Sequence, residues 1–162
     1  MATEFAATER RSSLLNASSH GGAYDVKCLA STVEVTVATG TGDTYVFGRV
    51  PSNARLLGSS RVYYDDMATT GAPTMDIGLA AVEGNLANAN DPDALSAGHT
   101  LATAANDSLA ITAIADYGKP AWDFVASETS DPGGSLAVYG TCVDAVTTAA
   151  GTFTIELYYV ID

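Results

Sequence analysis

The stretch TFTIELYYVI, residues 152–161, alternates between one set of large apolar side chains and a second, more polar set. The apolar set falls on one side of an extended chain and consists of Phe153, Ile155, Leu157, Tyr159 and Ile161. An apolar period of two indicates a half-buried β-strand, because an amphipathic helix would repeat its apolar positions every three or four residues. We therefore predict a long strand that runs nearly to the end of this sequence.

The same period recurs in TVEVTV, residues 32–37, where Val33, Val35 and Val37 share one face. Further candidate strands end at Gly, Pro, Asn or Asp, as strands usually do. They are TYVFGRV (44–50), ARLLGSSRVYY (54–64), PTMDIGLAAV (73–82), LAITAIADY (109–117), AWDFVAS (121–127) and SLAVYGTC (135–142). About eight short strands with turn signals between them predict an all-β fold, namely a sandwich, a jelly roll or a barrel, and of these we favour a jelly-roll-like β-sandwich.

Two segments break this pattern. NANDPDALSAG, residues 88–98, is expected to form a short helical turn, with Asn90 or Asp91 as its cap and Gly98 at its end. Residues 1–23 show neither a strand period nor an amphipathic stripe. We interpret them as an extended N-terminal arm, followed by a single β-sandwich domain over residues 24–162.

The composition excludes several functions. The 162 residues contain 19 acidic and 7 basic side chains, for a net charge of −12, which argues against a nucleic-acid-binding face. No apolar run approaches the about 18 residues of a membrane span, and the start lacks the apolar core of a signal peptide. We expect synthesis in the bacterial cytoplasm without export. Cys28 and Cys142 could pair across the sheets, although two buried thiols are favoured in a reducing compartment.

The sequence offers little for catalysis, and we expect no enzymatic activity, metal or cofactor. No CxxC or HExxH spacing occurs, and the Asp91 and Asp93 pair is attributed to helix capping rather than to calcium. His20 falls in the arm and His99 just after the helical turn, neither at an expected pocket. A small hydrolase is the alternative, and its test is whether a histidine approaches a serine and an aspartate within hydrogen-bond distance.

Three of the few basic residues gather in one strand-turn-strand stretch. Arg49 ends the first strand, Arg55 begins the next and Arg61 follows six residues later, shortly before Asp65 and Asp66. We interpret these five residues as scaffold or inter-subunit ion pairs. A pocket for an anionic ligand is the less favoured reading, since the two carboxylates lie close by.

Several segments resemble a family of tailed-bacteriophage head proteins, the decoration or cement proteins. The segments that carry the resemblance are RVPSNARLLGSSRVYYDD (49–66), APTMDIGL (72–79), ANDPDALSAG (89–98), YGKPAWDFV (117–125) and GTFTIELYYVI (151–161). The resemblance implies a small β-rich subunit, often trimeric, that binds the major capsid protein on the outside of the head and stabilises the shell. It attaches no catalytic residue to these positions.

For the arm we expect a contact with the capsid, through Phe5, Arg10, Arg11, Leu14 and Leu15. Two other functions stay open. Aromatic side chains such as Tyr63, Tyr64, Trp122 and Tyr139 would suit a carbohydrate-binding module, although Trp122 is expected in the core beside Phe124. A head-completion or tail subunit is the other alternative, and it would form rings.

Overall fold

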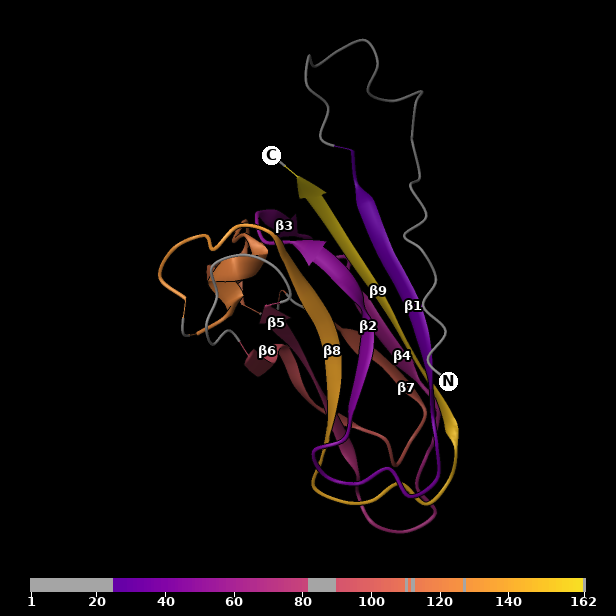
Figure 1. Ribbon diagram of the computed structural model, residues 1–162. Helices are drawn as coiled ribbons and strands as arrows, with labels where there is room; N and C mark the ends of the chain where they lie inside the picture. The colour runs from indigo at the N-terminus through magenta and orange to yellow at the C-terminus, as the bar shows by residue number, and fades with distance from the viewer. Residues whose placement is uncertain (1–24, 82–89, 110, 112, 127, 162) are drawn as a thin grey trace.

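The computed structural model describes residues 25–81, 90–109, 111, 113–126 and 128–161 of the chain. These residues form two antiparallel sheets that pack face to face as a β-sandwich (Figure 1). In the first sheet the order is β1-β9-β4-β7, with β3 also on β9, and in the second it is β2-β8-β5-β6. The strands are β1 (Lys27–Val35), β2 (Thr44–Pro51), β3 (Ala54–Leu56), β4 (Arg61–Tyr64), β5 (Thr74–Ala81), β6 (Asn90–Thr100), β7 (Ala105–Ser108), β8 (Ser135–Val143) and β9 (Gly151–Ile161). The predicted all-β sandwich is confirmed.

Strand β9 is central to the first sheet, as its apolar alternation predicts. It pairs with β1 along one side and with β3 and β4 on the other. Phe153, Ile155 and Leu157 are fully buried, while the outward-facing Thr154 hydrogen-bonds Thr32 of β1 through their hydroxyls at 2.8 Å. The alternation therefore places one face in the core and the other at the surface.

The core joins the two sheets through aromatic and aliphatic side chains. Phe47 of β2 and Phe153 of β9 lie with ring centroids 5.7 Å apart, one from each sheet. Trp122 is half-buried and packs against this core. It does so from a 3₁₀ helix and not, as predicted, from a strand.

The segment 88–98 is not a helical turn. Residues 90–98 lie within β6, and residues 88 and 89 lie outside the described part. The local capping pattern is overridden by pairing with β5, which is interrupted between Ile77 and Leu79 where β6 carries extra residues. Pro92 has no backbone N–H and cannot donate a hydrogen bond to a neighbouring strand, and it falls in that interrupted stretch. Asp91 caps no helix, and its side chain accepts a hydrogen bond from the Ala126 N–H at 2.9 Å.

Two other predicted strands are replaced by short 3₁₀ helices. Helix η1 (Ile114–Asp116) stands within the segment predicted as a strand over 109–117, and η2 (Ala121–Phe124) within 121–127. Ala121 at the start of η2 and Val125 just after its end are buried, whereas Trp122 and Phe124 between them are half-buried, so this segment does not show the alternating burial of a strand. The helix contacts β3 at one end of the sandwich, where Arg55 forms an isolated bridge with Pro120 (Figure 1).

The remaining predictions for the fold have mixed outcomes. The segment between β1 and β2, which contains Gly40 and Gly42, connects the two sheets, because β1 and β2 belong to different sheets. No disulfide joins Cys28 and Cys142, which also lie in different sheets. Cys142 is buried, which raises the pKa of its thiol to about 11, whereas Cys28 is only half-buried. Among the described residues, no helix has the length and apolarity needed to cross a membrane.

Candidate functional site

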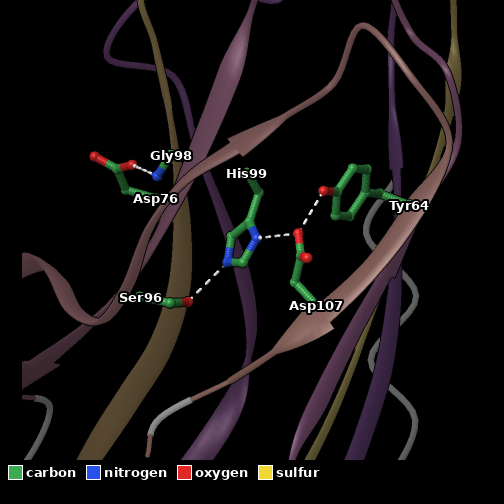
Figure 2. A network of polar contacts seen from close by, with 6 residues as sticks. All are labelled: Tyr64, Asp76, Ser96, Gly98, His99 and Asp107. Carbon is green, nitrogen blue, oxygen red and sulfur yellow. Dashed lines mark hydrogen bonds and ion pairs between the residues drawn. The ribbon is translucent and has the colours of Figure 1, made fainter. Parts of the chain in front are cut away.

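An irregularity in β6 positions the polar site of the molecule. Met75 of β5 pairs with His99, and Ile77 pairs with Ser96. A separation of three residues on β6 therefore lies opposite a separation of two residues on β5. Side chains alternate along a strand, so an odd separation would normally place Ser96 and His99 on opposite faces. One extra residue restores them to the same face. Gly98 makes this possible with a φ of 75°, and its N–H donates to the Asp76 carboxylate at 2.7 Å (Figure 2).

His99 joins a serine and an aspartate through its two ring nitrogens. Its Nε2 lies 2.8 Å from Ser96 Oγ, and its Nδ1 lies 3.2 Å from Asp107 Oδ2 (Figure 2). Asp107 belongs to β7, at the edge of the opposite sheet, and the same oxygen accepts a hydrogen bond of 2.6 Å from the Tyr64 hydroxyl. The network therefore bridges the two sheets where β6 and β7 form their edges.

The electrostatics favour an ionised carboxylate beside a neutral phenol. Hydrogen bonds from Tyr64 and then from His99 lower the pKa of Asp107 below its usual value. Burial, followed by the hydrogen bond to Asp107, raises the pKa of Tyr64 well above its usual value. In a neutral His99 ring, the proton on Nδ1 would then face the carboxylate, which leaves the Nε2 lone pair to accept from the Ser96 hydroxyl.

Aromatic packing fixes the plane of the imidazole. His99 is 5% exposed, and its ring centroid lies 5.8 Å from that of Tyr64 and 6.1 Å from that of Phe153. Tyr64 and Phe153 are themselves stacked at 5.4 Å with an interplanar angle of 8°. The ring can therefore change its tilt only if the core rearranges.

A cavity of about 610 Å³ opens over this network between β6, β7 and the two 3₁₀ helices. Its wall includes Ser96, His99 and Asp107 together with three further carboxylates and one ammonium, from Asp93, Asp116, Asp123 and Lys119. The Lys119 Nζ lies 3.1 Å from an Asp116 carboxylate oxygen and 5.8 Å from the centre of the Phe124 ring. The expectation that His99 lies away from any pocket is therefore wrong.

The three arginines lie on three strands. Arg49 is exposed on β2, in one sheet, whereas Arg55 on β3 and Arg61 on β4 belong to the other. A guanidinium nitrogen of Arg55 donates to the carbonyl of Gly118. Arg61 stands opposite Glu156 in the register of β4 and β9. Scaffold or inter-subunit ion pairing remains our prediction for these residues.

The two aspartates beside them hold the local backbone. Asp65 accepts hydrogen bonds from the N–H and the hydroxyl of Thr152, both at 2.8 Å, and these lower the pKa of its carboxyl group. Asp66 accepts from the Ala68 N–H at 3.1 Å. The predicted arm contacts (Phe5, Arg10, Arg11, Leu14 and Leu15) lie outside the described residues, as does His20.

The aromatic side chains named for sugar binding are split between core and surface. Tyr64 and Tyr139 are each 6% exposed, so neither presents a ring face for stacking on a sugar. Tyr63 is 42% exposed, and Tyr117, which was not among the side chains named from sequence, is 76% exposed. They stand on β4 and beside η1, so the exposed rings come from separate elements.

Ser96 and Asp107 were not recognised as site residues from sequence. The useful signal was Gly98, because a glycine inside a strand often marks a bulge. The criterion set for a hydrolase, a histidine within hydrogen-bond distance of both a serine and an aspartate, is met by His99.

Two solved structures share this fold over most of their length. A chain of the capsid of Ralstonia phage GP4 matches with a TM-score of 0.59 and 23% identity, covering 89% of each chain. A chain of the capsid asymmetric unit of cyanophage Pam1 matches with a TM-score of 0.57 and 19% identity, covering 89% of this chain and 90% of the other. No protein-family model and no curated protein matches. At these identities the likeness shows the β-sandwich fold.

Proposed function

We propose that this chain is a structural component of a bacteriophage capsid, and that it acts as a decoration protein on the outside of the head. The observation that supports this most is the whole-chain likeness to chains from two phage capsids, at about nine-tenths coverage on both sides. The sequence segments that resemble cement proteins point to the same role. The major capsid protein is the partner, and the chain assembles with itself, as a homotrimer.

The proposed stabilisation depends on the repetition of one contact over the whole shell and requires no chemical reaction. A shell presents the same contact many times, so a subunit that binds only the assembled shell lowers its free energy at every lattice point. A homotrimer engages three such points at once, which raises its apparent affinity without any new contact. The β-sandwich supplies a body that does not change shape when it binds.

The arm is the proposed clamp. It carries Arg10 and Arg11, a contiguous basic pair in a chain of net charge −12, and the apolar residues Phe5, Leu14 and Leu15. A basic pair attracts an acidic patch on the shell, and the apolar side chains add area to the contact.

The test uses the full chain and heads of the phage that encodes it, stripped of this protein. Sedimentation of heads with increasing amounts of protein should give saturation at a fixed ratio to the major capsid protein, with a trimer mass by light scattering. The double substitution Arg10→Gln and Arg11→Gln, which removes two positive charges, should weaken binding at least tenfold. Lys27→Glu on β1 changes the net charge by the same amount elsewhere and serves as the charge-matched control. No saturable binding by folded protein would reject the proposal.

A further inference from the structure

We infer that Ser96, His99 and Asp107 form an acyl-transfer site that accepts small esters with a neutral or cationic alcohol part. This activity is independent of the capsid role, and neither depends on the other. Ser96 is the nucleophile, His99 the general base and Asp107 the positioning residue. The observation behind it is the chain of contacts from Ser96 Oγ to His99 Nε2 at 2.8 Å and from Nδ1 to Asp107 Oδ2 at 3.2 Å, within the wall of one cavity.

The positions of Ser96, His99 and Asp107 meet the geometric requirements of a nucleophile, a general base and a group that orients the base. Both distances are close to hydrogen-bond length, and the two partners of His99 stand at opposite ring nitrogens, so one can take a proton while the other holds the ring. Asp107 is held in turn by the Tyr64 hydroxyl at 2.6 Å. Packing of the imidazole against Tyr64 and Phe153 limits its reorientation during proton transfer.

A purely structural role for the network would not require a cavity. A core histidine with two hydrogen-bond partners is fully satisfied when closed off from solvent. Here Ser96, His99 and Asp107 all line a cavity of about 610 Å³, and Ser96 is partly exposed. Ligand pockets have volumes of roughly 300 to 1,000 Å³. A small ester therefore has room beside the Ser96 hydroxyl.

The reaction balances without any cofactor. Ser96 Oγ adds to the ester carbonyl carbon as its proton moves to His99 Nε2, and the tetrahedral intermediate expels the alcohol oxygen, which takes that proton. A C–O bond to Ser96 has then replaced the C–O bond to the alcohol. Water repeats the sequence on the acyl-serine, releases a carboxylic acid and restores the hydroxyl. Asp107 stays ionised throughout.

The charge of the cavity wall sets the substrate class. Asp93, Asp107, Asp116 and Asp123 supply four carboxylates, and Lys119 supplies one ammonium that is already paired with Asp116. Such a wall repels anionic esters and concentrates cations. Phe124 provides an apolar surface in the same wall. Neutral and cationic esters should therefore react faster than anionic ones of equal size.

The experiment is covalent labelling of the full chain by an uncharged fluorophosphonate, with the labelled residue located by peptide mass spectrometry. The prediction is a single phosphonylated serine, Ser96, whose labelling disappears in Ser96→Ala and falls at least about 100-fold in His99→Gln. Ser108, the other serine that lines the cavity, should stay unlabelled. Ser59→Ala, at an exposed position outside the cavity, is the control, and its labelling rate should stay within about twofold of wild type.

Asp107→Asn separates positioning from binding. It should lower the maximal labelling rate at least about tenfold while changing the half-saturating probe concentration by less than about twofold. Hydrolysis of an acetate ester whose alcohol part carries a quaternary ammonium group should exceed that of an acetate ester of a similar-sized alcohol that carries a carboxylate. Folded wild-type protein that shows no label on Ser96, or labels Ser108 equally, would overturn the inference. Mapping the label on wild type decides the question even if a variant fails to fold.

Discussion

Replacing Phe153 by alanine should cost a large part of the stability of the sandwich. Phe153 is fully buried in β9 and contacts Phe47 of the opposite sheet at 5.7 Å and Tyr64 at 5.4 Å between ring centroids. Phe→Ala in a core costs about 3 to 5 kcal/mol, and each lost aromatic pair adds about 0.5 to 1.5 kcal/mol to the burial term. We expect a loss near the upper end of that range, about 4 to 5 kcal/mol.

Urea denaturation followed by tryptophan fluorescence and circular dichroism measures this loss. For a slope of about 2 kcal/mol per molar urea, the midpoint should fall by about 2 M. Phe153→Leu, which keeps most of the volume, should lose only about 1.5 kcal/mol. Tyr63→Ala, at a 42% exposed position on β4, should lose less than about 1 kcal/mol. A loss below about 1 kcal/mol for Phe153→Ala would refute the reasoning that this ring joins the two sheets.

Three further predictions concern the polar groups. Tyr64→Phe removes the hydroxyl that donates to Asp107 and should lower the unfolding free energy by about 1 kcal/mol, measured in urea, because water can partly replace the bond at the half-exposed carboxylate. The pKa of Asp93 is raised, chiefly by its contact with the Asp91 carboxyl, so its folded form binds a proton more tightly and loses stability as the pH rises through that pKa. Asp93→Asn should therefore raise the melting temperature at pH 7 by about 1 to 2 °C, and an unchanged or lower value would contradict this. Asp65 and Asp107 have lowered pKa values, so the stability they contribute is present above the ordinary value of 3.8 and is lost as the pH falls below it. Unfolding free energies at pH 5 and pH 3 should show this loss, and Asp65→Asn should reduce the difference.

The strands in which apolar and polar residues strictly alternate could be predicted from sequence, because the alternation in each strand indicates which of its side chains are buried. In β9 the apolar positions 153, 155 and 157 are all fully buried, and in β1 Val33 and Val35 are buried as expected. Val37 is 57% exposed because β1 ends at Val35. Alternation thus located the face of a strand better than its end.

The wrong prediction of a helical turn over residues 88–98, most of which belong to β6, has a different origin. Asn-Asp-Pro-Asp is a good helix-capping sequence when read locally, whereas the pairing of these residues with β5 depends on a partner strand elsewhere in the chain. The site was missed for the same reason. Tyr64 and Asp107 are 43 positions apart, and their contact depends on the pairing of β4 with β7. The spacing of these residues in the sequence does not indicate that they are in contact.

The measurement that tests the central claim most directly is a cryo-electron microscopy reconstruction of intact virions of the phage that encodes this chain. The account predicts this β-sandwich on the outer surface of the head at repeated lattice points, in groups of three, with the segment before residue 25 in contact with the major capsid protein. The chain confined to one vertex or to the tail would favour a head-completion or tail subunit. Its absence from the particle would contradict the account altogether.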